Sequence, residues 1–330
     1  MSNKTNYGKA LLEGFEYLLS NHRDVFVIGQ GLWSPWYVGS SMTDLDKKFG
    51  KERIIDTPVS ELACTGVALG ASLAGYKPIV VHPRIDFMLL AVDQIVNQAA
   101  KWHHMLGGTA TAPVTIRGII NRGGEQGAQH SQALHSWFAH IPGLRVVMPA
   151  TPADARDLLI SSVLCESPVV FIDDRWLYEQ EEDIGDVVEL RLENVEPAVR
   201  REGKDITLVA CGYSVSQAIE AAQTMERAGI TAEVIDLRVL NPVRWDKVVA
   251  SVEKTGHLLA IDGGWTNCGM AGEIVAAVSE RINWKKLKSA PRRVTLTDSP
   301  APTSGPLEDI YYTKVQDIVD QAGCILNGQV

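Results

Sequence analysis

The stretch KERIIDTPVSELACTGVALGASLAGYKPIVVH, residues 51–82, contains the pattern on which the fold depends. A short β-branched run at 51–56 is followed by a long segment of small and apolar residues at 60–75, and then by a second β-branched run at 77–82. The two runs have the length and composition of buried strands, whereas the segment between them is long enough for a helix. Two strands joined by a helix form a parallel pair.

The same alternation continues along the chain in both directions. In the first half we expect further strands at 24–29, 112–120, 144–149 and 167–173, and helices at 87–107 and 152–164. In the second half we expect strands at 205–212, 231–237, 257–262 and 292–298, and helices at 214–228 and 271–282. Strands that alternate with helices in this way are typical of mostly parallel sheets flanked by helices.

A polar stretch without clear period follows Tyr178 and runs to Lys204, as expected of a surface linker. We therefore predict an α/β protein of two domains, 1–190 with the linker at its end and 191–330, each a mostly parallel sheet flanked by helices. Within the second domain, the segment 262–265 (Asp-Gly-Gly-Trp) is expected to form a turn between a strand and a helix.

Composition excludes several classes of protein. The 31 Lys and Arg residues against 40 Asp and Glu give a formal net charge of −9, which argues against general binding of nucleic acid. The five cysteines form no C-x-x-C pair, so neither a disulfide framework nor a zinc site is indicated. No apolar run reaches the roughly 18 residues of a membrane span. We expect a cytoplasmic protein that binds neither nucleic acid nor membrane.

Three segments resemble one family, and their order and spacing make coincidence improbable. They are residues 54–61 running into 65–71, residues 93–101, and residues 127–132 together with 140–144. This set resembles the beta subunit of thiamine-diphosphate-dependent 2-oxo acid dehydrogenases of the pyruvate, branched-chain and acetoin type, in the transketolase-like superfamily. The resemblance implies a pyrimidine-binding first domain and a transketolase C-terminal-like second domain.

Glu61 is the first candidate catalytic residue. It follows Pro58 in the first turn of the expected helix, where a carboxylate is favoured by the helix dipole. The apolar residues behind it predict that this end of the helix is buried, and burial raises the pKa of a carboxyl group. The resemblance implies that Glu61 hydrogen-bonds the aminopyrimidine ring of thiamine diphosphate and promotes its activation.

His130 is the second candidate, and two apolar residues join it. His130 lies in a glycine-rich loop after a strand, where histidine can donate or accept a proton near pH 7. The resemblance implies that His130 contacts substrate and assists acyl transfer to lipoamide. It also implies that Phe87 and Leu89 contact the cofactor, although Phe87 could be only a core aromatic. His135 matches no residue of the family pattern.

The diphosphate end of the cofactor needs a divalent cation held by oxygen ligands. Thiamine enzymes of this superfamily provide it with a G-D-G motif, and this chain contains none. We therefore assign no metal ligand to this chain and expect a partner alpha-type chain to supply magnesium. The resemblance also implies a second beta chain in a heterotetramer, a lipoyl carrier protein and a 2-oxo acid substrate.

The sequence departs from the family pattern at several positions. Gln30 stands where the family usually has an acid, and Leu90 replaces a glutamine of pyruvate-using members. The run 82–84 (His-Pro-Arg) is also unusual. We therefore expect the segment from His82 to Leu90 to change the shape of the site on the side that binds the substrate, and we do not assign pyruvate as the substrate. Cys165 replaces an acid near the family's monovalent-cation loop, so no potassium site is assigned.

Two other functions remain open from the sequence. One is the C-terminal half of a split transketolase or a related ketol-transferring enzyme, although the run 127–132 (G-A-Q-H-S-Q) favours the dehydrogenase type. The other is an inactive regulatory or scaffolding subunit, against which the retention of Glu61, Phe87 and His130 counts.

Overall fold

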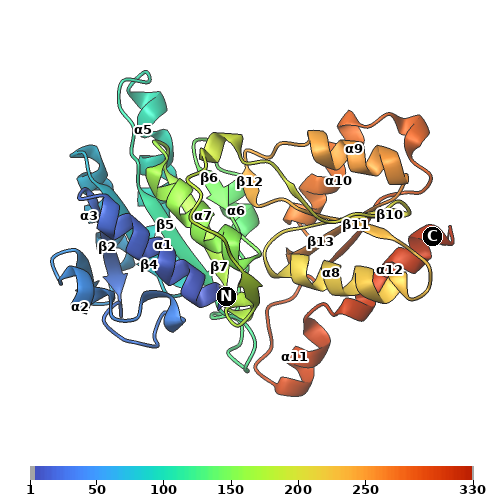
Figure 1. Ribbon diagram of the computed structural model, residues 1–330, viewed down its shortest axis with the longest axis horizontal. Coiled ribbons are helices and arrows are strands. Elements are labelled where there is room, and N and C mark those ends of the chain that lie inside the picture. The colour runs from blue at the N-terminus through green and yellow to red at the C-terminus, as the bar shows by residue number, and fades with distance from the viewer. Residues whose placement is uncertain (1–3, 329–330) are drawn as a thin grey trace. The chain divides into compact units, whose positions relative to one another are not determined.

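The computed structural model describes residues 4–328 and divides the chain into two compact units. Among the described residues, unit 1 comprises 4–122 and 137–195, and unit 2 comprises 123–136 and 196–328. Each unit is built around its own sheet (Figure 1). The expected fold class, two α/β parts with mostly parallel sheets flanked by helices, is confirmed.

The main sheet of unit 1 is parallel and has the strand order β6-β7-β5-β4-β2-β3. Their bounds are β2 Val25–Gln30, β3 Ile54–Thr57, β4 Lys77–His82, β5 Thr115–Ile120, β6 Arg145–Val147 and β7 Val169–Asp174. Every residue of β5 and β7 is buried, as expected of central strands covered on both faces. All six strands end at the same edge, which is where open parallel sheets bind ligands.

The helices of unit 1 begin at recognisable signals. Asn6 accepts a hydrogen bond from the backbone N–H of Lys9 at the start of α1, and Thr151 does the same for Asp154 at the start of α7. Helices α1 and α7 pack against each other. The bounds are α1 Tyr7–Asn21, α2 Leu45–Phe49, α3 Glu61–Leu73, α4 Ile85–Met88, α5 Ala100–Met105, α6 His135–Ala139 and α7 Pro152–Leu164, of which α6 begins in unit 2.

The expected long helix at 87–107 is broken into shorter pieces. A 3₁₀ turn, Leu89–Ala91, and a π-helical segment, Asp93–Ala99, separate α4 from α5. Such π segments occur frequently at functional sites, and this one begins four residues after Leu89. A small antiparallel pair, β1 (Lys4–Asn6) with β8 (Glu181–Asp183), completes the regular structure of unit 1.

Unit 2 contains a five-stranded sheet in the order β14-β13-β10-β11-β9. Helices α9 and α10 lie on one face of it, and α8 and α12 on the other (Figure 1). The bounds are β9 Ala198–Arg201, β10 Ile206–Ala210, α8 Tyr213–Glu226, β11 Ala232–Asp236, β12 Val239–Asn241, α9 Asp246–Thr255, β13 Leu258–Trp265, α10 Met270–Arg281, β14 Arg292–Leu296, α11 Gly305–Tyr311 and α12 Val315–Leu326.

The structure also differs from the expected organisation in the linker, in the segment 262–265 and at the boundaries between the two units. Residues 198–201, expected to be linker, form the antiparallel edge strand β9. The expected turn at 262–265 is wrong, because these residues belong to β13, whose register shifts between Ile261 and Trp265. Unit 1 extends to Val195, past the expected boundary at 190, and the loop 123–136 belongs to unit 2.

Candidate functional site

Glu61 is the first residue of α3, directly after the carboxyl end of β3. Its carboxylate lies in the first turn, where the helix dipole favours a negative charge. The expectation that Glu61 is buried is wrong for this chain, because its side chain is only partly covered. The outer face of α3 next to it is apolar and exposed, with Leu62 at 51% and Val67 at 59% exposure.

A small pocket opens beside Glu61 at the carboxyl edge of the unit 1 sheet. It is lined by Gly29, Gln30, Thr57, Ser60, Glu61, Cys64, Val81, His82 and Pro83. The lining comes from the ends of β2, β3 and β4 and from the start of α3. This is the position at which parallel α/β sheets bind small molecules.

The strands beside this pocket approach closely. A Cβ atom at Gly29 would lie 2.4 Å from the backbone oxygen of Val81, so only glycine fits there. Beyond it, the side-chain amide of Gln30 donates a 2.7 Å hydrogen bond to the hydroxyl of Tyr37. Gln30 therefore gives this side of the pocket a neutral, hydrogen-bonded side chain.

His82 is a buried polar residue of the pocket wall. Its Nε2 atom lies 3.1 Å from Oγ1 of Thr65 on α3, and both side chains are buried. Burial lowers the pKa of His82 to about 4, so the imidazole is neutral at physiological pH. Cys64 completes this wall, with its Sγ atom donating to Oγ1 of Thr57 at 3.1 Å.

Phe87 and Leu89 lie on the same unit as Glu61. Phe87 belongs to α4 and is 37% exposed, so one part of its ring packs in the protein and another part is accessible. Leu89 begins the 3₁₀ turn that follows and is partly exposed. Leu90 beside it is 63% exposed. An accessible aromatic ring with neighbouring leucines can contact a flat heterocycle.

His130 lies in unit 2, in the loop 123–136, and is partly exposed. Its backbone N–H donates to the carbonyl of Gly127, which closes a turn. Gly127 has a positive φ of 73°, and a Cβ atom there would lie 2.3 Å from Cγ2 of Thr303. Glycine is therefore required at this turn, both by its backbone conformation and by its close neighbour.

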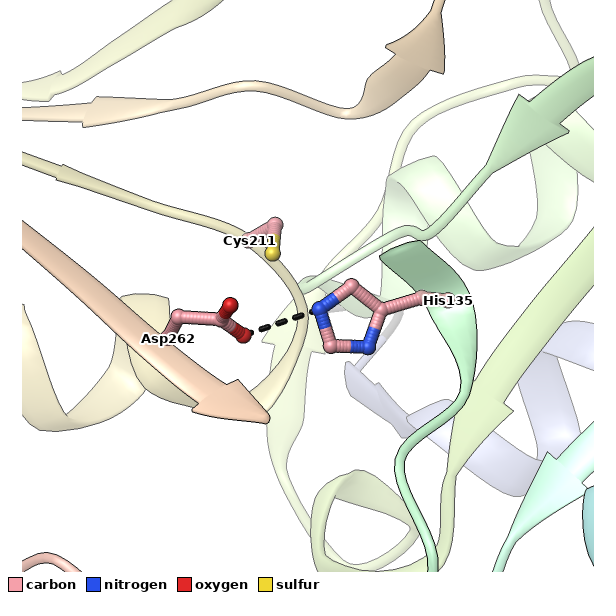
Figure 2. Close-up of side chains that lie close together, drawn as sticks. All are labelled: His135, Cys211 and Asp262. Carbon is pink, nitrogen blue, oxygen red and sulfur yellow. Dashed lines mark hydrogen bonds and ion pairs between the residues drawn. The ribbon is translucent and has the colours of Figure 1, made fainter. Parts of the chain in front are cut away.

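A buried cluster in unit 2 joins the end of this loop to the sheet. Figure 2 shows His135, Cys211 and Asp262 together, with Nε2 of His135 2.8 Å from Oδ1 of Asp262. Burial by itself would raise the pKa of Asp262, but the interaction with His135 and two backbone N–H donors outweigh burial and lower that pKa. One donor atom from each of the three side chains lies within 4.8 Å of the other two.

No motif in the sequence indicates this cluster. Its members are 76 and 51 residues apart along the chain (135 to 211 and 211 to 262), and the segment containing Asp262 was expected to be a turn. The one available signal was His135 itself, a histidine that follows Ala133 and Leu134 and matches no residue of the family pattern.

The comparisons with known proteins cover nearly the whole chain. Residues 3–180 match the transketolase pyrimidine binding domain, and residues 196–318 match the transketolase C-terminal domain. The chain belongs to the transketolase family. Within this family the resemblance to the beta subunits of 2-oxo acid dehydrogenases is confirmed by relatives of that type at 34–40% identity.

Three proteins illustrate the place of the chain in the transketolase family. The acetoin:2,6-dichlorophenolindophenol oxidoreductase subunit beta of Cupriavidus necator is 40% identical over 84% of this chain and 81% of its own length. The human mitochondrial pyruvate dehydrogenase E1 component subunit beta is 34% identical over 94% and 87%. The structure of a split gene transketolase, an inactive beta4 tetramer, is 24% identical and superposes with a TM-score of 0.75 over 97% and 96%, which shows the shared fold.

In the part of the chain that the structure describes, no helix has the length and apolar character required to cross a membrane.

Proposed function

We propose that this chain is the beta component of a thiamine-diphosphate-dependent 2-oxo acid dehydrogenase, which decarboxylates a 2-oxo acid oxidatively and transfers the acyl group to a lipoyl carrier. The observation that carries this proposal is the position of Glu61. Its side chain is partly exposed and lines a pocket at the carboxyl edge of a parallel sheet. Exposed apolar residues of α3 lie beside it. The relatives named as acetoin and pyruvate dehydrogenase beta subunits support the same class of reaction.

The side chains around the pocket would supply the contacts to the pyrimidine end of thiamine diphosphate. Bound thiamine diphosphate supplies a carbon nucleophile for the 2-oxo group and accepts the electrons that decarboxylation releases. Glu61 would hold a proton in a hydrogen bond with a ring nitrogen of the pyrimidine. The accessible ring of Phe87 would pack against the heterocycle, and Leu89 would exclude water from one side of it.

The diphosphate end would be held by an alpha-type partner chain that also supplies magnesium. The sequence has no G-D-G motif, and this chain offers only the pyrimidine half of the site. Val59, Leu62 and Val67 are large apolar residues with 51–68% exposure on α3 or directly before it. Apolar surface gathered beside a candidate site is typical of a subunit contact, which supports an alpha chain here and a second beta chain in the tetramer.

His130 would act on the acyl group. Transfer of the acyl group to one sulfur of a lipoyl disulfide breaks the S–S bond, and the other sulfur leaves as a thiolate that must take up a proton. Histidine is the side chain that most often provides such a proton in catalysis. We propose the segment from His82 to Leu90 as the part that selects the 2-oxo acid. Support comes from Arg84 in that segment, whose guanidinium is partly buried, donates to the carbonyl of Asn121 at 3.4 Å and has its pKa lowered by burial.

We further propose a cytoplasmic location. The five cysteines all lie within the described residues, and none is in a disulfide. Three of them, Cys64, Cys165 and Cys211, are buried thiols, which is the usual state in a reducing compartment.

The proposal is tested by reconstitution with an alpha-type chain from the same organism. The chain alone should bind thiamine diphosphate weakly and show no turnover, whereas the pair should bind it with magnesium and reduce a lipoyl acceptor in the presence of a 2-oxo acid. A panel of 2-oxo acids and ketose phosphates identifies the substrate. Tight magnesium-dependent binding by the chain alone, or transfer of ketol units from ketose phosphates only, would contradict the proposal.

A further inference from the structure

The buried pair His135 and Asp262 fixes one end of the His130 loop to the sheet of unit 2. Asp262 lies in β13 and is 0% exposed, and His135 is 1% exposed. Oδ1 of Asp262 accepts from the backbone N–H of Gly264 at 2.8 Å as well as from His135, and Oδ2 accepts from the N–H of Ala271 at 3.2 Å. The carboxylate is therefore held by the strand and by the start of α10, and His135 binds to a fixed partner.

The other end of the loop is fixed by Glu125. Its carboxylate accepts a 2.6 Å hydrogen bond from the N–H of Gly305, and its own N–H donates to Glu308 at 2.9 Å. Both partners lie in or beside α11 of the same unit. His130 stands five residues after Glu125 and five before His135, so each flanking segment spans at most about 17 Å.

We propose that the pair His135 and Asp262 is a clamp that positions His130, so that both are positioning residues for the acyl-transfer step. The role of His130 in that step rests on the proposed function. With both ends of the loop tied to one rigid unit, the imidazole of His130 samples few positions, and a reaction gains rate when its groups are held in place.

A metal ion is the competing occupant of the same cluster. His, Cys and Asp are zinc ligands, and their donor atoms are close enough to share an ion. However, 2.8 Å between Nε2 and Oδ1 is a hydrogen-bond distance, and the oxygens of Asp262 already accept three hydrogen bonds. A proton on Nε2 satisfies this geometry without an ion, and the observations therefore favour the hydrogen-bonded clamp.

Hydrogen exchange of the full chain tests the clamp independently of activity. His135→Leu places an apolar side chain of similar size at this position and removes the donor, whereas His135→Gln can still donate from its amide to Asp262. Asp236→Asn is the matched control, because Asp236 is also a buried acid at 0% exposure in the unit 2 sheet, paired with Arg200. The amides of residues 123–134 should exchange at least ten-fold faster in His135→Leu, and within about three-fold of wild type in the other two variants.

The reconstituted enzyme gives the second readout. We expect a fall of at least ten-fold in kcat for His135→Leu with a KM for the 2-oxo acid close to wild type, and recovery of most of that loss in His135→Gln. Unchanged exchange in His135→Leu, or equal acceleration in Asp236→Asn, would overturn the clamp. Stoichiometric zinc in the purified chain that is lost in His135→Leu would also overturn it. Since exchange is measured without substrate, an enzyme with a different activity would contradict the proposed function and leave the clamp intact.

Discussion

Nε2 of His82 lies 3.1 Å from Oγ1 of Thr65, which joins the last residue of β4 to the second turn of α3. Thr65 is one helical turn after Glu61. The buried imidazole thus fixes the helix that presents the candidate catalytic carboxylate, and it does so in its neutral form.

This pair predicts a specific dependence of stability on pH. The pKa of His82 is lowered from 6.5 to about 4 by burial. Between these values the unfolded chain binds a proton that the folded chain excludes, so acidification across this range lowers the free energy of unfolding by on the order of 3 kcal/mol. Above pH 6.5 His82 is neutral in both the folded and the unfolded chain, so this loss of unfolding free energy is absent. His82→Phe removes the titrating imidazole. Urea unfolding at several pH values should therefore show a smaller fall in the free energy of unfolding on acidification in this variant than in the wild type.

The control for this measurement is the exposed His104, which lies at the end of α5. His104→Gln should unfold with the pH dependence of the wild type. If His82→Phe also retains the wild-type slope, His82 is not the residue responsible.

Gly29 predicts a large effect of a single methyl group. Gly29→Ala would place Cβ 2.4 Å from the carbonyl oxygen of Val81, which requires β2 and β4 to separate. We expect a loss of about 2 kcal/mol or more in the free energy of unfolding, as for other overpacked sites. Gly70 on α3 is the contrasting site, because a Cβ there meets nothing within 4 Å. Gly70→Ala should stabilise the isolated chain by roughly 0.5–1 kcal/mol, and the reverse ranking in urea unfolding would refute this packing argument.

Arg84 predicts a change of substrate preference. Its guanidinium is partly buried at the carboxyl edge of the sheet, two residues after His82. Arg84→Ala should change the ratio of kcat/KM between 2-oxo acids of different side-chain charge by roughly ten-fold, the effect of one lost charge-assisted hydrogen bond. Arg84→Lys keeps the charge and should preserve part of the preference. If the ratio of kcat/KM is unchanged in Arg84→Ala, the segment from His82 to Leu90 does not select the substrate.

The local sequence pattern was sufficient to predict most of the helices and strands. The bounds of β4 and α7 agree with their expected ranges, because a continuous apolar, β-branched run, a Pro at the first helical turn and the Thr151 cap are all local signals. Strand β9 could not be predicted in this way. It is an edge strand without fully buried residues, and its pairing depends on β11 and on the contact between Arg200 and Asp236.

The site was only partly predictable for a related reason. The loop 123–136 is fixed by contacts to residues far along the chain, among them Gly305, 180 positions from Glu125. No periodicity in the loop indicates such partners. The burial of Glu61 was wrongly expected because the apolar composition of α3 does not reveal whether its outer face packs within the chain or remains exposed, as Leu62 and Val67 are here.

The proposed role of Glu61 in proton transfer is tested by Glu61→Gln in the reconstituted enzyme. This variant keeps the shape of the side chain and removes its proton-holding carboxylate, so kcat should fall by about 100-fold or more while the free energy of unfolding changes by less than about 0.5 kcal/mol. Glu273→Gln is the matched control, because Glu273 is an exposed first-turn carboxylate of α10 in the other unit, and its turnover should equal that of wild type. Near-normal turnover of Glu61→Gln would show that the carboxylate of Glu61 does not take part in the reaction.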